Sequence, residues 1–349
     1  MRHSEKKLEE LIEKLMFLRD IPGLAVAVGE GEEVLYAKGF GVKNVDTGEP
    51  VEPETIFHMA SVTKLFVGTS LMQLRERKGI DLHKPVVEYL PYFRLKDERY
   101  KKITLFQLLS HFSGMPDCED YGWDKPAFDD QALERYVKGL GDLTLLWEPG
   151  ERFSYSNPAY EVLGDVIAKL SGESFEDYVQ NYILKPLKME NSTLLTAQRK
   201  DRERMASPHV KDKQNRIIVS EIYPYNREHA PSSTLTSNVL DMVRWGAANL
   251  NRGELEGNRI LDASSYELMW SPVGDINERE KIGISWFLKN HREYQIMGHE
   301  GNDIGFRSSF SIMPEKNLSV TVVANIQTAT TKKIMHMVYD WVLGFEPQI

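Results

Sequence analysis

Residues 23–39, Gly-Leu-Ala-Val-Ala-Val-Gly-Glu-Gly-Glu-Glu-Val-Leu-Tyr-Ala-Lys-Gly, decide the fold of this 349-residue chain. The apolar run at 23–29 is typical of a buried strand, the polar residues 30–32 of a turn, and 33–39 of the returning strand of a hairpin. Further strand patterns, alternating or continuously apolar, return only late in the chain, at 282–288, 293–297, 305–313 and 318–325. The strands therefore come from the two ends of the sequence.

Helical patterns fill the remainder. An amphipathic helix is predicted within 1–20, a second helix over 61–79, and a last one over 328–343. Residues 82–250 favour helical segments and long loops. The simplest arrangement is an α/β (α+β) fold, in which one antiparallel sheet built from both chain ends is flanked by helices and carries an inserted helical lobe.

This pattern divides the chain into two lobes. We expect residues 1–60 and 275–349 to form the α/β sheet lobe, and residues 61–274 the mostly helical lobe. The active site is expected to lie between them.

Composition narrows the choice of partners and compartments. The net charge of −9 argues against nucleic acid as the main partner. Cys118 is the single cysteine, so no intrachain disulfide forms, and we interpret it as a structural or incidental thiol. No stretch approaches the roughly 18 apolar residues that span a membrane. Residues 1–20 do not resemble a secretory signal, so we expect a cytoplasmic protein, although a chain whose signal had been removed would look the same.

Ser61-Val62-Thr63-Lys64 is the first of three stretches with catalytic potential. On a helix, residues i and i+3 share a face, so Lys64 would lie beside the Ser61 hydroxyl. A lysine buried among apolar side chains loses its charge more readily and acts as a base. The pattern alone is weak, because Ser4-Glu5-Lys6-Lys7 also matches it without catalytic meaning.

Tyr155-Ser156-Asn157 is the second stretch, and it lies between a Pro/Gly-rich turn and a helix beginning near Pro158. A phenol can relay a proton, and the Asn157 amide can bind a carbonyl and the lysine. The alternative is that Asn157 only caps the helix and Tyr155 is a core aromatic residue.

His299-Glu300-Gly301 is the third stretch, placed just before the strand at 305–313. Gly301 allows a backbone or a ligand to approach closely, and N–H groups here could hold an oxyanion. No second histidine lies at helical spacing, so a metal site is not expected. Taken alone, His299 is typical of a structural histidine at a strand end.

The three motifs in this order resemble the serine β-lactamase and penicillin-binding protein family, in its branch of class C-like β-lactamases, D-amino-acid peptidases and family VIII-type esterases. Residues 108–115, 155–189 and 297–325 are also similar to stretches of that family. The resemblance extends from about Ile21 to Leu343.

The resemblance implies a role for each motif residue. Ser61 would be the acylated nucleophile, Lys64 would help take its proton, and Tyr155 would pass the proton to the leaving group. Asn157 would bind the substrate's carbonyl side chain or amide. The backbone N–H groups of Ser61 and Asn302 would form the oxyanion hole, and His299 and Gly301 would line the substrate site.

Two departures from the family pattern bear on the substrate. His299 stands where class C β-lactamases carry the lysine of Lys-Thr-Gly, and a neutral histidine holds a carboxylate less well. Ala230-Pro231-Ser232-Ser233 stands where relatives often have a glycine pair.

The prediction is a serine hydrolase that forms an acyl-enzyme on small esters or amides, with a small-molecule substrate and no cofactor. An esterase or D-amino-acid peptidase is favoured over a dedicated class C-like β-lactamase. A non-catalytic binding or scaffold protein that kept the fold is the alternative from another class. The sequence leaves the oligomeric state open.

Overall fold

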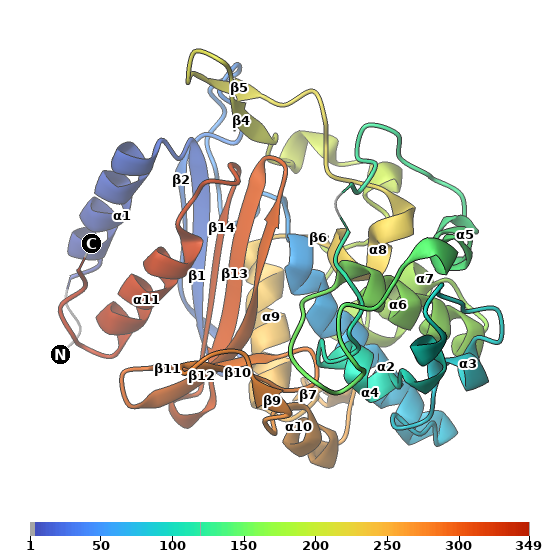
Figure 1. Ribbon diagram of the computed structural model, residues 1–349. Helices are drawn as coiled ribbons and strands as arrows, with labels where there is room; N and C mark the ends of the chain where they lie inside the picture. Colours follow the sequence, from blue (N-terminus) through green and yellow to red (C-terminus); the bar gives the residue numbers. More distant parts are fainter. Residues whose placement is uncertain (1–3, 119, 349) are drawn as a thin grey trace.

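An eight-stranded antiparallel sheet forms the centre of the computed structural model, which describes residues 4–118 and 120–348 (Figure 1). The strand order is β2-β1-β14-β13-β12-β11-β10-β9. The strands of this sheet are β1 (Gly23–Glu30), β2 (Glu33–Gly41), β9 (Gly274–Asp275), β10 (Glu280–Ile282), β11 (Phe287–His291), β12 (Tyr294–Asp303), β13 (Phe306–Met313) and β14 (Leu318–Ala324). The predicted hairpin and the antiparallel sheet from both chain ends are confirmed.

Strand β1 is buried on both faces, which explains its unbroken apolar sequence. Leu24, Val26 and Val28 belong to the apolar cluster under α1 (Glu5–Arg19) and α11 (Thr331–Val342). Ala25 and Ala27 belong to the larger cluster on the opposite face, where α9 (Val239–Leu250) packs against the sheet. Side chains alternate between the two faces of a strand, so a strand with helices on both sides is apolar throughout.

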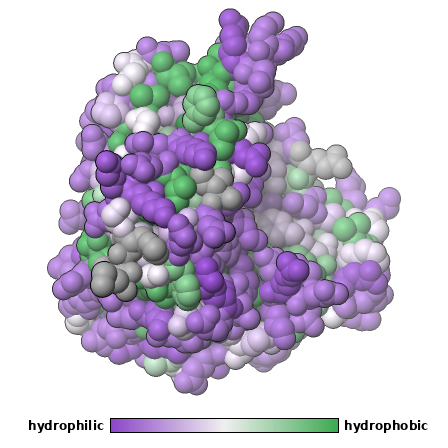
Figure 2. All heavy atoms as spheres, turned by 90° about the vertical axis from the view of Figure 1, so that its left-hand side faces the viewer, coloured by the Kyte–Doolittle hydropathy of each residue, from purple (hydrophilic) through white to green (hydrophobic). Residues whose placement is uncertain are grey.

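Helices α1 and α11 cover the outer face of the sheet, on the left in Figure 1. Figure 2 shows this side of the molecule, which is largely hydrophilic, with hydrophobic residues gathered toward its upper part. The exposed apolar side chains of α1 are Phe17 and Leu18, near its end. Among the residues described, no helix is long and apolar enough to cross a membrane.

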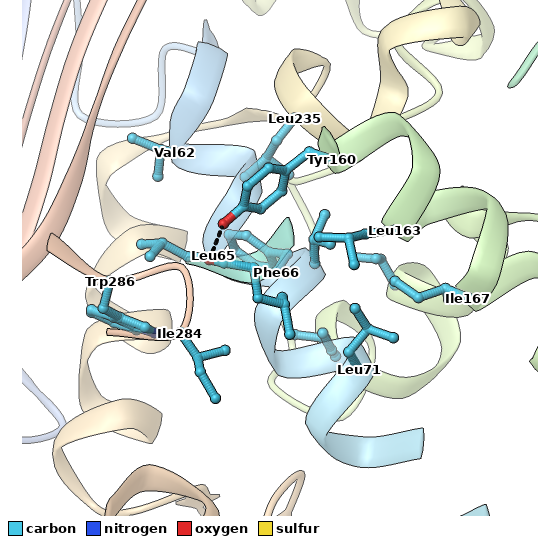
Figure 3. Close-up of a cluster of buried hydrophobic side chains, with 14 of the residues drawn as sticks. Val62, Leu65, Phe66, Leu71, Tyr160, Leu163, Ile167, Leu235, Ile284 and Trp286 are labelled. Atoms are coloured by element: carbon cyan, nitrogen blue, oxygen red, sulfur yellow. Dashed lines mark hydrogen bonds between the residues drawn. The ribbon is translucent and has the colours of Figure 1, made fainter. Parts of the chain in front are cut away.

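The mostly helical region lies on the other side of the sheet (Figure 1). Its centre is the contact of α2 (Lys64–Lys78) with α6 (Asn157–Ser171), where Leu65 and Phe66 meet Tyr160 (Figure 3). The remaining helices are α3 (Val86–Tyr89), α4 (Leu105–Leu109), α5 (Ala132–Lys138), α7 (Phe175–Val179), α8 (Ala230–Ser233) and α10 (Ala263–Met269). Gly79 ends α2 with a left-handed φ of 66°, as its sequence predicts.

Short strand pairs also occur outside the large sheet, and all of their strands except Phe57–His58 lie within 61–274, the part of the chain predicted as mostly helical. They are β3 (Phe57–His58) with β6 (Thr236–Ser237), β4 (His209–Lys211) with β5 (Ile217–Val219), and β7 (Glu254–Leu255) with β8 (Asn258–Arg259).

The predicted strand at 282–288 is wrong as a single element, because β10 ends at Ile282 and β11 begins at Phe287. Between them Ser285 adopts a left-handed φ of 65° and leaves the sheet. Its N–H donates to the Leu109 carbonyl at 3.0 Å, and its hydroxyl is hydrogen-bonded to the Tyr160 phenol oxygen at 2.9 Å. The helical region thus takes over hydrogen bonds that a continuous strand would make with its neighbours.

The predicted strand at 293–297 is too short. Strand β12 continues to Asp303, so Gly298–Asn302 lies within a strand rather than before one. This segment pairs residue by residue with β13. The third motif therefore belongs to a fixed strand of the sheet.

Candidate active site

Ser61 lies in a tight connection between the sheet region and α2. The sequence predicts it at the start of an α-helix, but the structure places it in a 3₁₀ turn, Ala60–Thr63, that leads into α2. Ala60, just before it, has a left-handed φ of 47°, which is a strained conformation for a residue with a side chain. The Thr63 hydroxyl donates to the Ala60 carbonyl at 2.6 Å and holds this turn in place.

Lys64 is fully buried beneath Ser61. Its Nζ lies 3.0 Å from Ser61 Oγ, and it donates to Asn157 Oδ1 at 2.5 Å and to the Ser232 carbonyl at 2.8 Å. Burial lowers the pKa of Lys64 to about 8, although nearby carboxylates oppose the shift.

The contacts of Lys64 suit the neutral amine. A neutral amine carries two N–H groups and one lone pair. Asn157 Oδ1 and the Ser232 carbonyl accept the two N–H groups, since neither oxygen can donate. The lone pair is then left for the Ser61 hydroxyl, which is the arrangement a general base needs.

Tyr155 lies beside both residues. Its phenol interacts with the Ser61 hydroxyl, and its ring centroid is 5.1 Å from Lys64 Nζ. Burial raises the pKa of Tyr155 well above its usual value, so the phenol keeps its proton. The ring stacks on His111 with centroids 4.3 Å apart, and His111 Nδ1 accepts from Ser156 N at 3.1 Å. The phenol is therefore held in one orientation near the nucleophile.

Asn157 is not the residue that caps α6. Ser156 does so, because its hydroxyl accepts from the backbone N–H of Ala159. The two hydrogens of Asn157 Nδ2 go to Asp117 Oδ1 at 3.0 Å and to the Tyr121 hydroxyl at 2.6 Å. With Oδ1 on Lys64, the whole amide is fixed within the protein.

Gly301 lets β12 approach the turn that carries Ser61. A Cβ built on Gly301 would lie 2.5 Å from the Met59 carbonyl oxygen and 2.8 Å from Ala60 Cβ. The Ser308 hydroxyl of the neighbouring strand donates to the same Met59 carbonyl at 2.6 Å. Glycine is required here by the close approach of two backbones.

Replacing Gly301 by alanine is expected to displace Ser61. The added methyl group meets backbone atoms, which have little freedom to move, so we expect a loss of about 1–3 kcal/mol of stability and at least a tenfold loss of kcat/KM for ester hydrolysis. Gly141→Ala is the matched control, because nothing lies within 4 Å of a Cβ there. Equal activities of the two variants would contradict the tight approach.

His299 is a neutral imidazole in this site. Its Nδ1 lies 2.6 Å from the Glu300 carbonyl, which can only accept, so the proton is on Nδ1. Burial and the charge of Lys64 lower the pKa of His299 to about 3. Nε2 is buried without a hydrogen-bond partner among the described residues. The site thus presents an acceptor where a lysine would present a cation.

The site opens into a cavity of about 430 Å³. Of the residues predicted from the sequence, it is lined by Ser61, Tyr155, Asn157, His299, Gly301 and Asn302. Lys64 lies below its floor and is reached through Ser61. The structure therefore brings together all seven residues that the motifs single out.

Other lining or supporting residues were missed by sequence reasoning. Asp117 and Tyr121 fix Asn157, and the Ser232 carbonyl fixes Lys64. Asp303 also lines the cavity and accepts from His58 Nε2 at 2.7 Å and from the Ser233 hydroxyl. Asp303 and Ser232 had a signal in the sequence, since Asp303 stands two residues after the third motif and Ser232 lies in the stretch 230–233 that departs from the family pattern.

Cys118 has the surroundings of an unreactive thiol. The Cys118 thiol donates to the Asp120 carbonyl at 2.8 Å, and burial raises its pKa, which suits an unreactive thiol. Within residues 4–118 and 120–348 no group of three or more His, Cys, Asp or Glu side chains is arranged to hold a metal ion.

Comparison with known proteins agrees with the fold and the motifs. The profile of the family described as Beta-lactamase matches residues 8–338. "Protein flp" of Staphylococcus aureus (strain MW2) is 25% identical over 333 residues, which cover 95% of this chain and 65% of that protein. The chain thus spans just under two thirds of the length of this relative. "Penicillin-binding protein 4" of Amycolatopsis lactamdurans is 27% identical, with 93% of this chain and 86% of that protein covered.

A solved structure shows the same fold. The octameric penicillin-binding protein homologue from Pyrococcus abyssi has a TM-score of 0.85 and 28% sequence identity, covering 99% of this chain and 78% of that one. The family profile spans nearly the whole chain, and the three motifs meet in one cavity. This chain belongs to the Beta-lactamase family of serine hydrolases and penicillin-binding proteins.

Proposed function

We propose that this protein hydrolyses small esters or amides through an acyl-enzyme on Ser61. The observation that carries the proposal is the lone pair of neutral Lys64, which the contacts with Asn157 and Ser232 direct at the Ser61 hydroxyl. We further propose that the cavity lies between a sheet lobe, 1–60 with 275–349, and a helical lobe, 61–274.

Acylation would proceed as follows. Lys64 removes the Ser61 proton as Oγ attacks the substrate carbonyl, and the N–H groups of Ser61 and Asn302 stabilise the oxyanion. The proton then reaches the leaving group through the Tyr155 phenol. In deacylation a water molecule attacks the ester carbonyl, the same groups accept its proton, and Ser61 is regenerated.

Asn157 has a narrower role in this proposal than the family pattern implies. Both Nδ2 hydrogens are already donated to Asp117 and Tyr121, so a substrate carbonyl would have to share one of them. Its main contribution is to hold Lys64 through Oδ1.

An esterase or peptidase is a better fit than a dedicated β-lactamase. The β-lactam carboxylate needs a cation or strong donors, but the neutral His299 supplies an acceptor where the family has a lysine. The cations that line the cavity, Lys289, Arg307 and Lys332, are already paired with Glu300 and Glu280. The non-catalytic alternative is disfavoured by the hydrogen bonds joining Ser61, Lys64 and Asn157, which a scaffold protein does not need.

The pH dependence of acylation should follow the protonation state of the Lys64 amine. Because the neutral amine is the active form, kcat/KM should rise with pH and level off above the pKa of Lys64, which is about 8. His299 stays neutral throughout this range, since its pKa is lowered to about 3. Ester hydrolysis measured against pH, corrected for spontaneous hydrolysis, checks this. A profile that falls as the pH rises toward 8 would contradict the base role.

The first experiment combines a fluorescent penicillin, nitrocefin and p-nitrophenyl acetate with intact-mass measurement. Ester turnover with a transient acetyl adduct on Ser61 and no lasting lactam adduct supports the esterase. A stable penicilloyl adduct with slow turnover indicates a peptidase-like enzyme, and rapid nitrocefin hydrolysis indicates a β-lactamase. Neither adduct nor turnover with any probe would overturn the proposal.

A further inference from the structure

Two carboxylates in the cavity wall, Asp117 and Asp303, are here called the acidic wall. Asp117 Oδ1 accepts from Asn157 N at 2.8 Å and Asn157 Nδ2 at 3.0 Å, and from Cys118 N at 2.9 Å. Asp303 Oδ2 accepts from His58 and Ser233. In each residue one oxygen is thus fixed by the protein, while the other receives no hydrogen bond from residues 4–118 and 120–348.

The charges of the acidic wall are not neutralised by neighbours. Neither carboxylate forms an ion pair with a lysine or arginine in the described part of the chain. His58 donates to Asp303 through Nε2, and its Nδ1 is buried without a hydrogen-bond partner in the described part of the chain.

The other acids that line the cavity are paired. Glu300 lies 3.0 Å from Lys289 and 3.5 Å from Arg307, and Glu280 lies 2.9 Å from Lys332. The unpaired negative charge of the cavity is therefore concentrated in Asp117 and Asp303.

Both carboxylates are linked to the Lys64 amine through residues that hydrogen-bond to it or stand next to one that does. Asp117 binds Asn157, which accepts from Lys64. Asp303 binds Ser233, whose neighbour Ser232 accepts from Lys64 through its carbonyl. Both negative charges act on Lys64 and partly offset the effect of its burial on its pKa. A charge bound at the acidic wall would thus be close to the carbonyl that Ser61 attacks.

His299 independently indicates a donor in the ligand. Its side chain lines the same cavity and is only 5% exposed, yet Nε2 has no hydrogen-bond partner among the described residues. Because Nδ1 carries the proton, Nε2 can only accept. A buried acceptor left unfilled is costly, and a substrate N–H would satisfy it.

We propose that the acidic wall and His299 bind a protonated primary amine, so that the preferred substrates are esters or amides whose acyl group carries an ammonium close to the scissile carbonyl. An alkylammonium has three N–H donors, and three residues that line the cavity each have an acceptor atom with no hydrogen bond from the described residues, Asp117 Oδ2, Asp303 Oδ1 and the buried His299 Nε2. This assignment of substrate class rests on the proposed acyl-enzyme chemistry of Ser61.

The test compares three p-nitrophenyl esters, those of alanine, N-acetylalanine and propionic acid, with both enantiomers of the first two. The pH is kept below the pKa of the amino ester, and spontaneous hydrolysis is subtracted. For one alanine enantiomer or both, kcat/KM should exceed that of the N-acetyl and propionyl esters by about tenfold or more, because charge-assisted hydrogen bonds form only with the ammonium.

Variants of the two aspartates test whether the acidic wall causes the preference for the free amine. Asp117→Asn and Asp303→Asn each keep an accepting oxygen for the existing contacts but lose the charge, and each should lower the ratio of alanine to propionyl ester several-fold. Asp142→Asn is the control, because it removes an exposed charge away from the cavity and should leave the ratio unchanged.

The outcomes separate the two proposals. Turnover of all three esters through a Ser61 adduct without preference for the free amine would overturn the ammonium site and leave the hydrolase intact. A preference that both Asn variants retain would also overturn it. No adduct with any ester would overturn the acyl-enzyme proposal itself.

Discussion

Replacing Ser61 by alanine is expected to abolish ester hydrolysis and acyl-enzyme formation, with kcat lowered by about 10⁴-fold or more. The Ser61 oxygen is the only nucleophile within hydrogen-bond reach of Lys64 Nζ among the described residues, so no neighbouring group can replace it. The change removes one hydroxyl at the cavity surface and leaves the contacts of Lys64 with Asn157 and Ser232 in place. Steady-state turnover of p-nitrophenyl acetate and the intact mass after mixing measure the effect.

The chain contains a matched control for this variant. Ser4 stands three residues before Lys7, as Ser61 stands before Lys64, but it caps α1 on the exposed surface. Ser4→Ala should cost about 1 kcal/mol of stability through the lost cap and leave turnover unchanged. Hydrolysis at an unchanged rate in Ser61→Ala would exclude Ser61 as the nucleophile.

Replacing Lys64 by arginine is expected to lower the acylation rate by about 10²–10⁴-fold, although the formal charge is kept. Arginine stays protonated in proteins and has no lone pair to accept the Ser61 proton. Its planar head group also fits poorly where Nζ reaches Ser61, Asn157 and the Ser232 carbonyl within 3.0 Å. The acylation rate is measured from the initial burst with p-nitrophenyl acetate.

Lys7→Arg makes the same exchange in the surface motif and should leave the burst unchanged. Circular dichroism and thermal unfolding would show whether Lys64→Arg is folded. A folded Lys64→Arg protein that acylates at the wild-type rate would rule out a neutral lysine as the base, even if Ser61 remained the nucleophile.

The sheet could be predicted because its pattern is local. In β1 every residue from Gly23 to Gly29 is buried, and the chain reverses at once into β2, so apolar composition and turn residues suffice. The interruption between β10 and β11 could not be predicted in this way. It depends on the hydrogen bonds of Ser285 with Leu109 and Tyr160, which lie far away in the sequence.

The site was predictable to the extent that its residues form short motifs. Ser61 and Lys64 are three residues apart, and the resemblance supplied the partners Tyr155 and Asn157. Asp117 and Ser232 act on Asn157 and Lys64 across 40 and 168 residues, and no pattern in the sequence indicates either contact. Contacts of this kind depend on how loops fold against α6 and α2. The spacing of apolar residues in the sequence does not predict the folding of these loops.

The pairing of β1 with β14 also determines when the candidate site can assemble during synthesis. Leu24 pairs with Ala324, and β12 reaches the Ser61 turn only as part of the sheet that β13 and β14 complete. Such distant pairings form slowly, because a long loop must close before any contact is gained. During synthesis Ser61 and Lys64 leave the ribosome early. The turn that carries them packs against Gly301 of β12 only after the last strands of the sheet have been made. The nascent chain is therefore expected to stay inactive until β14 has left the exit tunnel.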